Sequence, residues 1–565
     1  MKKRAYLHFA LAAILLGIAF ACASAGKKSH DAATARNLTT FNALVKVLEE
    51  NYVDTIRTDE AFRQAIGAML STVDPYTEYY TADDAEQLMR MTTGEYGGIG
   101  SYIMVRDSCT YISGPYENSP AAKAGLLPGD KILFVDSIDV ASKFNPDVSK
   151  LLRGQPGTKV RVKVARPYIG PDSILDITVT RAKLQEPSVT YSGVVADSTG
   201  YLNLTSFITK SPDEVRNAVK DLLADPKVNS LVLDLRGNGG GLVESAVEIL
   251  SLFLPKGTEV LSTRGSDARP GKTYKTRHDP IVPSSMPLAV LIDGGSASAS
   301  EITAGALQDL DRAVLVGSRS FGKGLVQSTL PLPFDGMLKV TVAKYLLPSG
   351  RLIQALDYSR RNPDGSVART PDSLTNVYRT LAGREVRDGG GLTPDSIIEW
   401  PMPSSLLYQL VTDHKIFDYA NRFYASGRKV DNPHTFTITD SIYADFSSTL
   451  DPSRFNYKNS AEPILKQLRD AAKIEGFDSD ETSAVLARID SIFSPSLERD
   501  LKLRRDEVSQ YLEEEIVSRY HFNRGKQIAI LKKDPALDAA ISILRSPRYR
   551  EILAPGKSSQ KKSKK

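Results

Sequence analysis

Two short segments of the chain carry side chains that together could perform nucleophilic chemistry. The first, residues 293–301 (Asp-Gly-Gly-Ser-Ala-Ser-Ala-Ser-Glu), places hydroxyls where a helix is expected to begin. The second, residues 320–324 (Ser-Phe-Gly-Lys-Gly), holds Lys323 between two glycines. No histidine lies between Ser298 and Gly324, so the base available in this part of the chain is an amine. A serine activated by a lysine is a variant of the serine triad, and it predicts a hydrolase of acyl bonds, most simply a protease.

The lysine can act as a base only in a particular setting. A serine hydroxyl is a weak nucleophile at neutral pH and needs a base within hydrogen-bond reach. A lysine amine has an ordinary pKa of about 10.4, and burial lowers that pKa because desolvation disfavours the charged form. Phe321, Leu325 and Val326 are close enough in sequence to supply apolar walls around Lys323. We therefore expect Lys323 to lie in a water-poor pocket beside a serine.

Three serines, Ser296, Ser298 and Ser300, compete for the role of nucleophile, and local chemistry does not choose among them. Backbone amides at the start of the following helix would stabilise an oxyanion at any of the three. A second donor is expected from residues 239–241 (Gly-Gly-Gly), which end the glycine turn 236–241 (Arg-Gly-Asn-Gly-Gly-Gly). Both glycine-rich segments follow apolar runs that are typical of buried strands, so we expect them to open on the same edge of one sheet.

The elements that must position these residues alternate between strands and helices over residues 187–400, which indicates an α/β layered core. The apolar patterns predict buried strands at 231–235, 287–292 and 313–317, and helices over 242–253 and around Ile302, Ala306 and Leu310. Residues 36–92 are predicted to form an N-terminal helical region that packs as a helical pair, and residues 401–556 a charged helical C-terminal region. No catalytic set of residues is apparent in either helical region.

Residues 94–182 form a segment of short strands and glycine turns that resembles a PDZ domain. The resemblance is carried by Gly97-Gly98-Ile99-Gly100, by residues 119–126 (Ser-Pro-Ala-Ala-Lys-Ala-Gly-Leu) and by residues 129–132 (Gly-Asp-Lys-Ile). It implies that the first loop offers N–H groups to a terminal carboxylate while the adjacent strand edge pairs with the peptide. The alternative interpretation is a small β domain that only packs.

A second resemblance is more specific. Residues 296–301 (Ser-Ala-Ser-Ala-Ser-Glu), the Phe-Gly-Lys-Gly loop and Gln327 resemble the signature of the C-terminal processing peptidases, also called tail-specific proteases. The segment 233–241 (Leu-Asp-Leu-Arg-Gly-Asn-Gly-Gly-Gly) and the PDZ-like domain agree with that family, and the likeness covers roughly residues 40–400. It implies a ClpP/crotonase-like α/β protease core, accompanied by the PDZ-like β domain and the two helical regions.

The same resemblance implies roles for individual residues. Ser298, the middle serine, would be the nucleophile, Lys323 the general base, and Gln327 the residue that orients the lysine. Because residues i and i+4 on a strand share a face, Lys323 and Gln327 are expected to point at one site. We expect the oxyanion hole to use the amides of Ala299, Gly240 and Gly241, and Glu301 to support the site without taking part in the chemistry.

The chain departs from the family pattern at positions beside the expected site. Asp293 stands where asparagine is common, and Gly239 where the glycine turn often has proline. Ser318 and Ser320 stand where glutamate and threonine are common. None of them supplies a proposed catalytic side chain, so they affect the fine geometry and not the reaction.

Composition and the first residues bear on location. The formal net charge of +5 over 565 residues argues against a nucleic-acid binder, and the basic tail at 557–565 is interpreted as solvated. Residues 1–25 have the basic start, apolar run and Ala-Ser-Ala ending of an export signal, which predicts a periplasmic protein. Lipidation of Cys22 is the alternative to simple cleavage. Cys109 would then have no intramolecular partner.

These features predict an exported serine endopeptidase that recognises protein C-termini through its PDZ-like domain and cleaves with a Ser298/Lys323 dyad. Arg153, in the PDZ-like segment, is a hypothetical link between peptide capture and activation. The competing interpretations are a non-catalytic PDZ scaffold, a hydrolase of another acyl substrate, and a protease that uses His278 as its base. The expected partners are proteins with accessible C-termini. An adaptor protein and a homo-oligomer are left open, and no nucleic acid, cofactor or metal is expected.

Overall fold

The computed structural model describes residues 31–554 apart from 142–147, 171–172, 267–269, 359–360, 363, 401, 454 and 459. The expected export signal at 1–25, with Cys22, and the basic tail at 557–565 lie outside the described residues. The chain divides into two units, Met1–Tyr79 and Tyr80–Lys565, and each is described by itself. A short strand, β1 (Glu78–Tyr80), spans their boundary.

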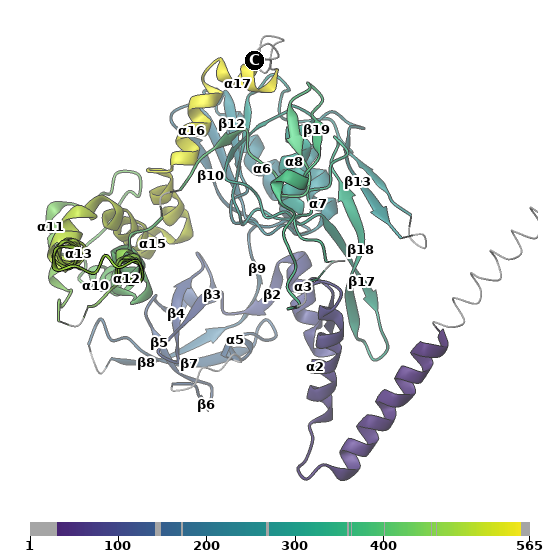
Figure 1. Cartoon of the computed structure of the whole chain (residues 1–565), viewed down its shortest axis with the longest axis horizontal. Helices are drawn as coiled ribbons and strands as arrows, with labels where there is room; N and C mark the ends of the chain where they lie inside the picture. The colour runs from purple at the N-terminus through teal and green to yellow at the C-terminus, as the bar shows by residue number, and fades with distance from the viewer. Residues whose placement is uncertain are drawn as a thin grey trace, which may run out of the picture. The chain divides into compact units, whose positions relative to one another are not determined.

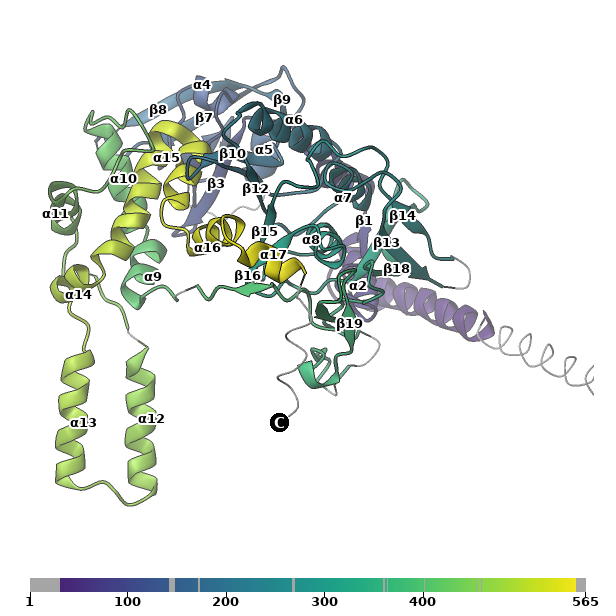
Figure 2. The same cartoon turned by 90° about the horizontal axis from the view of Figure 1, so that it is seen from above.

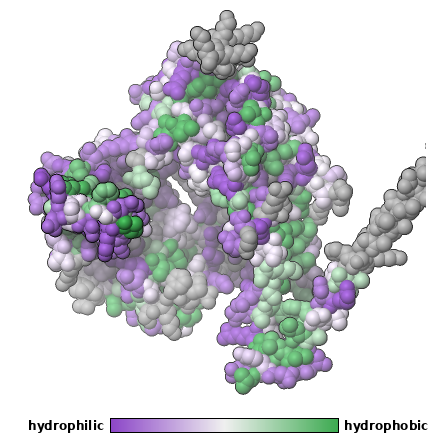
Figure 3. Space-filling model, viewed as in Figure 1, coloured by the Kyte–Doolittle hydropathy of each residue, from purple (hydrophilic) through white to green (hydrophobic). Residues whose placement is uncertain are grey.

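The first unit is a pair of helices, as the apolar spacing predicts. One helix covers residues 31–51 and the other is α2 (Thr58–Ser71). They meet through Phe41 and Phe62, whose ring centroids lie 5.7 Å apart in an edge-on arrangement. Large apolar side chains nevertheless stay on the surface of both helices, which is visible as green surface in Figure 3. The expected helical region is interrupted by β1 before α3 (Ala85–Thr93) resumes it.

The PDZ-like domain is built around an antiparallel sheet of order β3-β4-β5-β7-β8, in which β3 is an edge strand. Its elements are β2 (Glu95–Gly98), β3 (Ser101–Arg106), β4 (Cys109–Pro115), α4 (Pro120–Lys123), β5 (Lys131–Val135), β6 (Ile138–Asp139), α5 (Val148–Leu152), β7 (Lys159–Ala165), β8 (Ile174–Thr180) and β9 (Ala182–Gln185). Strand β2 pairs with β9, and alternate residues of β7 face a common apolar core with Ile112, Leu126 and Ile132.

The central sheet has the order β10-β11-β12-β15-β16-β21, and all of its pairings after β10/β11 are parallel. Its elements and first helices are β10 (Val189–Val195), β11 (Thr199–Leu204), α6 (Ser211–Ala224), β12 (Ser230–Asp234), α7 (Val243–Leu250), β15 (Leu288–Ile292), α8 (Ala299–Asp309), β16 (Val314–Gly317) and β21 (Ser396–Ile397). Every residue of β12 and β15 is buried, as the continuous apolar runs predict for a sheet covered on both faces. The α/β layered core is confirmed (Figure 1).

The two faces of this sheet are covered by distant parts of the chain. Leu231, Leu233 and Val290 pack with helices α6, α7 and α8. The intervening residues Val232 and Ala289 pack on the other face with α16 (Pro535–Leu544). The C-terminal helices therefore complete the α/β core as its second outer layer (Figure 2).

A second, antiparallel sheet lies beside the core. Strand β18 (Met337–Leu346) pairs with both β17 (Leu325–Pro331) and β13 (Glu259–Gly265), and β13 pairs with β14 (Thr273–Lys275). A hairpin of β19 (Val377–Arg379) and β20 (Glu385–Arg387) follows. Two short 3-10 helices, η1 (Ala82–Asp84) and η2 (Asp372–Leu374), complete the connections.

The region after residue 401 is helical, as predicted. Its helices are α9 (Ser405–Thr412), α10 (Lys415–Ala425), α11 (Asp440–Ser448), α12 (Ala461–Ile474), α13 (Asp480–Phe493), α14 (Leu497–Leu503), α15 (Arg505–Leu531), α16 and α17 (Arg548–Leu553). Helices α12 and α13 run side by side as a hairpin joined by the Arg469–Asp490 ion pair (Figure 2). Among residues 31–554, no described helix combines the length and apolar character needed to cross a bilayer.

Candidate active site

The serine segment forms a strand–turn–helix unit. Strand β15 ends at Ile292, the chain turns, and α8 begins at Ala299 with Ser298 as its N-cap. Ser298 has φ 57° and ψ −114°, a conformation that an L-residue adopts only at a cost of about 1–3 kcal/mol. Strain of this kind is typical of a nucleophile presented on a sharp turn between a strand and a helix.

The two neighbouring serines hold the turn together. Ser296 Oγ donates to the carbonyl of Leu235 at 2.8 Å, and Ser300 Oγ donates to the carbonyl of Asn238 at 2.8 Å. Both serines are fully buried, whereas Ser298 is 9% exposed. The hydroxyls of Ser296 and Ser300 thus cross-link the serine turn to the glycine turn, which leaves Ser298 as the serine best suited to meet a substrate.

The lysine loop crosses the start of α8. Lys323 is half-buried, and the fully buried Tyr345 of β18 donates its hydroxyl to the Lys323 carbonyl at 2.8 Å and to the Ser298 carbonyl at 3.4 Å. Gly322 has φ +91°, and a Cβ there would lie 2.5 Å from Ala355 Cβ. The glycine before Lys323 is therefore required both by the turn and by close packing.

A buried carboxylate joins the serine turn to the lysine loop. Glu301 Oε2 accepts the amides of Ser298 and Lys323, each at 2.9 Å, so these two nitrogens can lie no farther apart than twice that distance. Glu301 Oε1 accepts the Gly322 amide at 2.7 Å and Ser320 Oγ at 2.5 Å. Burial raises the pKa of Glu301 to about 7 even though these four hydrogen bonds lower it. The residue therefore organises both halves of the site.

Sequence reasoning gave Glu301 only a supporting role and did not single out Tyr345. The spacing Ser298-x-x-Glu301 is that of a capping box, in which the third helical residue accepts the N-cap amide. That signal could have placed Glu301 beside Ser298. Its contacts with the lysine loop depend on tertiary packing, and so does the position of Tyr345.

The glycine turn lies against the serine turn, as the shared sheet edge predicts. A Cβ on Gly240 would lie 2.6 Å from the Ala297 carbonyl oxygen and 2.8 Å from Ser298 Cβ, and Gly240 has φ +99°. Its amide donates to Asn238 Oδ1 at 2.8 Å. Of the expected oxyanion donors, Gly240 is thus engaged inside its own turn in this conformation. Ala299 follows Ser298 directly at the start of α8, and the Gly241 backbone is bridged in parallel to Phe207.

Asp293, a departure from the family pattern, has a structural role. Its Oδ1 accepts the amides of Gly237 and Gly295, both at 2.9 Å, and of Ser296 at 3.1 Å. An asparagine has one acceptor oxygen that could make the same contacts. This substitution therefore fits the geometry of the turn.

Gln327 lies on β17, and the structure does not support the alternation argument that linked it to Lys323. Strand β17 begins at Leu325, so Lys323 precedes it, and the pairing register with β18 shifts between Val326 and Gln327. Such an irregularity changes which face a side chain takes. Gln327 Nε2 donates to Thr341 Oγ1 of β18 at 3.1 Å.

The PDZ-like domain has a groove beside its edge strand. A cavity of 220 Å³ is lined by Ile99 and Gly100, by β3, and by α5 with the following Arg153. Gly97 and Gly98 instead lie in β2, paired with β9, and are not among the residues that line this groove. Arg153 Nη2 donates to Ser149 Oγ of α5 at 2.8 Å. An edge strand, a helix and an arginine together suit an extended peptide that ends in a carboxylate.

A larger cavity adjoins this groove and is lined partly by residues of the α/β core. It has a volume of 740 Å³ and shares Tyr102 and Tyr116 with the groove. It is also lined by Ser206 and Ile208. The residue between them, Phe207, donates its amide to the Gly240 carbonyl. The two cavities therefore adjoin each other, and the larger one reaches the segment that is hydrogen-bonded to the glycine turn.

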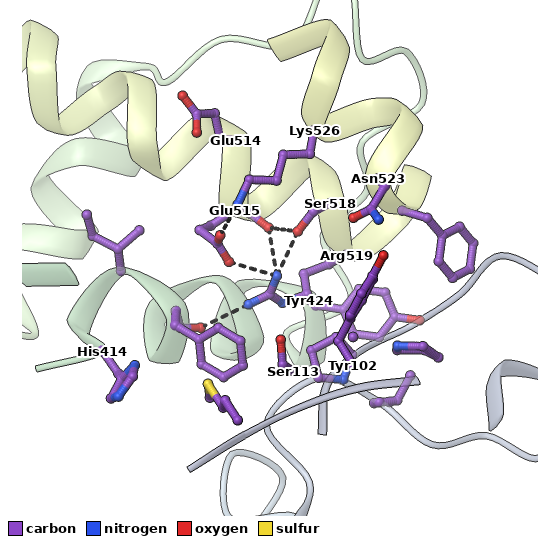
Figure 4. Close-up of a pocket in the computed structure, with 18 of the residues that line it drawn as sticks. Tyr102, Ser113, His414, Tyr424, Glu514, Glu515, Ser518, Arg519, Asn523 and Lys526 are labelled. Atoms are coloured by element: carbon purple, nitrogen blue, oxygen red, sulfur yellow. Dashed lines mark hydrogen bonds and ion pairs between the residues drawn. The ribbon is translucent and has the colours of Figure 1, made fainter. Parts of the chain in front are cut away.

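The PDZ-like domain is also joined to the C-terminal helices. A cavity of 490 Å³ between them is lined by Tyr102 of β3 and by Arg519 of α15, which pairs with Glu515 at 3.0 Å (Figure 4). Burial alone would raise the pKa of Glu515, but Arg519 and Lys526 lower it to about 2. The C-terminal helices thus contact both the PDZ-like domain and the core.

Other candidates are not brought to this site. The His278 side chain is 59% exposed and lies 3.2 Å from Glu248 Oε2, so it has the surroundings of a surface loop residue. Cys109 is buried at the start of β4, where its Sγ contacts the Ala141 carbonyl. Among residues 31–554, the described part shows no group of three acidic, histidine or cysteine side chains that could hold a metal ion.

Comparisons with known proteins agree with this arrangement. Residues 198–364 match the model of peptidase family S41, residues 111–166 a PDZ-domain model, and residues 406–544 a model described as the C-terminal helical domain of a probable PDZ-protease. A PDZ domain beside an S41 core defines the class as a PDZ-containing serine peptidase with a helical C-terminal domain.

A carboxy-terminal-processing protease of Bartonella bacilliformis is 33% identical over 373 residues, which cover 66% of this chain and 77% of the relative. A probable CtpA-like serine protease of Staphylococcus haemolyticus is 29% identical over 425 residues, covering 75% and 82%. The solved photosystem II D1 C-terminal processing protease is 27% identical, with a TM-score of 0.35 and coverage of 64% and 86%. The chain belongs to the carboxy-terminal-processing proteases of peptidase family S41. This membership makes it a serine protease and argues against the non-catalytic scaffold.

Proposed function

We propose that this protease cleaves polypeptides with a Ser298/Lys323 dyad after its PDZ domain has captured their C-termini. The observation that carries the dyad is the shared acceptor Glu301 Oε2, which brings the Ser298 and Lys323 backbones together. Ser298 is also the one of the three candidate serines with a positive φ, and its two neighbours use their hydroxyls inside the fold.

The proposed reaction is acyl transfer through an ester. The neutral Lys323 amine takes the Ser298 Oγ proton as the oxygen attacks the scissile carbonyl, and the proton then goes to the leaving amine. Water, deprotonated by the same amine, hydrolyses the resulting acyl-serine. The amides of Ala299 and Gly241 are the proposed oxyanion donors. Gly240 would join them after exchanging its bond to Asn238. Gln327 would orient the lysine, and the ClpP/crotonase-like character of the core stays a prediction.

C-terminal selection rests on the PDZ groove and on the cavity that continues it toward the glycine turn. We propose that the substrate chain adds to the free edge of β3, with its carboxylate near Gly100 and Arg153. Peptides that differ only in a free carboxylate or an amide at an apolar C-terminus test this directly. The free acid should show a KM about tenfold lower, because a charge-assisted contact is worth roughly 1.5–3 kcal/mol. Equal KM values would contradict C-terminal capture.

Export is proposed from the sequence of residues 1–25 alone. Mass analysis of the mature chain from bacteria tests it. A first residue of Gly26 supports cleavage after Ala25, and a lipid-bearing Cys22 supports the anchored alternative. A cytoplasmic chain that keeps Met1 would contradict both.

The dyad is tested with Ser298→Ala and Lys323→Ala in the full chain, each expected to lower kcat by at least about a thousandfold. Lys344→Ala is a matched control, since Lys344 is exposed on β18 opposite Leu325. It should cleave within about twofold of wild type. Equal cleavage by all of these proteins would end the dyad proposal.

A further inference from the structure

The N-terminus of α16 lies beside the first residue of the glycine turn. Asp534 caps this helix, because its Oδ1 accepts the amides of Ala536 and Leu537, both at 3.0 Å. The same carboxylate accepts the Arg236 guanidinium through two bonds, Nη1 to Oδ1 at 3.1 Å and Nη2 to Oδ2 at 2.6 Å. Asp534 is fully buried, so this pair is not a surface contact. It links the C-terminal helical region to the protease core.

Arg236 is also fixed on its other sides. Asp234, at the end of β12, accepts the Arg236 amide at 2.9 Å and its Nη2 at 2.5 Å, and Tyr201 donates to Asp234 at 2.6 Å. The ring of Trp400 covers the guanidinium, with its centroid 5.7 Å from Arg236 Cζ. The guanidinium therefore has one orientation, held by two carboxylates and an aromatic face.

The turn that Arg236 begins reaches Ser298 within a few residues. Gly237 donates its amide to Asp293 Oδ1 at 2.9 Å. The Asn238 carbonyl accepts the Ala297 amide at 3.0 Å and Ser300 Oγ at 2.8 Å. A displacement of Arg236 would thus move Asn238, and with it the backbone on both sides of Ser298.

A role in stability alone does not account well for this ion pair. Ala540, Ile543 and Leu544 already pack α16 against the sheet. A buried ion pair is weak evidence for stability, because desolvation offsets much of the attraction, and the better-attested use of such pairs is to fix one geometry. The geometry fixed here is that of the glycine turn.

We propose that Asp534 is a positioning residue for proteolysis: it holds Arg236, and through it the Gly237–Gly241 turn against Ser298. The active site is then complete only when α16 is docked on the core. This inference rests on the proposed roles of Ser298 and the glycine turn. If the C-terminal helical region supplies part of the scaffold of the site, there is a reason for the chain to return to the sheet, through the end of α15 and α16, after the excursion of α9 to α14.

The test uses Asp534→Asn in the full chain, since asparagine also caps helices but cannot offer a charged fork to arginine. Asp538→Asn is the matched control, an exposed aspartate one turn further along the same helix. We expect Asp534→Asn to lower kcat about tenfold or more with KM unchanged at a temperature where the protein is folded, because small displacements in an active site cost up to about 100-fold. Fluorescence of Trp400, the sole tryptophan in the sequence, should also change. Asp538→Asn should alter neither.

A lowered melting temperature with kcat and Trp400 emission both within twofold of wild type would overturn the proposal. If Asp534→Asn does not fold, Arg236→Lys replaces it, because that change keeps the helix cap and the positive charge but removes the fork. It should reproduce the loss of kcat at unchanged KM, and wild-type kcat would again overturn the inference. An error in the proposed dyad can be distinguished from an error in this inference. If the dyad is wrong, Ser298→Ala keeps its proteolytic activity, irrespective of the kcat of Asp534→Asn.

Discussion

The exchange of Glu301 for glutamine tests whether one buried carboxylate holds the serine turn and the lysine loop together. Its two oxygens accept four donors, from Ser298, Lys323, Gly322 and Ser320. Glutamine has one oxygen and one amide nitrogen, so whichever way it is turned its NH₂ group faces two donors. One half of the bridge is then lost, and two donors are buried without an acceptor.

The structure gives the size of two opposing effects. Loss of two hydrogen bonds to a charged acceptor costs about 3–6 kcal/mol, at roughly 1.5–3 kcal/mol each. Against this, glutamine escapes the desolvation of the carboxylate, and the raised pKa of about 7 shows that this desolvation outweighs all four hydrogen bonds by about 3 kcal/mol. The stability at neutral pH should therefore change by no more than about 3 kcal/mol in either direction. The loss of geometry has no such offset, and kcat should fall by about 100-fold.

The assay combines thermal unfolding with kcat measured on a peptide that has an apolar, free C-terminus. Glu514→Gln is a matched control, because Glu514 is also buried with its pKa raised to about 7 by burial, but lines the cavity beside the PDZ domain. Glu514→Gln should keep kcat within a few-fold. Wild-type kcat in folded Glu301→Gln would refute the reasoning.

The pH dependence of stability gives a second check on Glu301. Because its pKa is raised on folding, its contribution to stability is fully present below pH 4.5 and is lost as the pH rises through about 7. Wild type should therefore lose about 3 kcal/mol more than Glu301→Gln between these values. Equal slopes would show that Glu301 does not carry the raised pKa.

Two further predictions concern the glycine turn and the PDZ groove. Gly240→Ala should lower kcat at least about 100-fold, because the new Cβ would lie 2.6 Å from the Ala297 carbonyl oxygen and Gly240 has φ +99°. Gly239→Ala is the control and should cleave normally, because a Cβ on Gly239 would have no atom within 4 Å. Equal kcat values for the two variants would contradict the close approach of the turns. Arg153→Ala should raise KM about tenfold for peptides with a free C-terminal carboxylate but not for peptides with a C-terminal amide. Lys150→Ala, on the exposed face of α5, is the control and should leave both KM values unchanged. An unchanged preference of Arg153→Ala for the free carboxylate would exclude a role of Arg153 in capture.

The α/β core could be predicted from sequence because its strands are buried on both faces. The runs that form β12 and β15 are continuously apolar, and such runs identify strands of this kind without knowledge of their neighbours. The glycine turn comes directly after β12 and the serine turn directly after β15. The sequence therefore also predicts that the two turns meet at one edge of the sheet. The helix that covers the second face of the sheet could not be predicted. Helix α16 follows the last of these strands by more than two hundred residues, and its apolar residues do not identify the surface on which it packs.

The details of the site depend on contacts that periodicity does not encode. Strand alternation predicts that Lys323 and Gln327 share one face, but β17 starts after Lys323 and its register shifts between Val326 and Gln327. The sequence predicts that Gly97 to Gly100 form one binding loop, whereas Gly97 and Gly98 pair with β9 and, of these four residues, only Ile99 and Gly100 line the groove. Glu301 carried a recognisable capping spacing, yet its second set of partners arrives from the lysine loop.

Peptide mapping of an acid-quenched reaction tests the central claim most directly. If Ser298 attacks the scissile carbonyl, the peptide that contains residues 296–300 should carry the acyl half of the substrate, with the ester located at Ser298 by fragmentation. The adduct should be absent from Lys323→Ala, in which no amine is available to take the proton. An adduct on Ser296 or Ser300, or undiminished acylation without Lys323, would contradict the account.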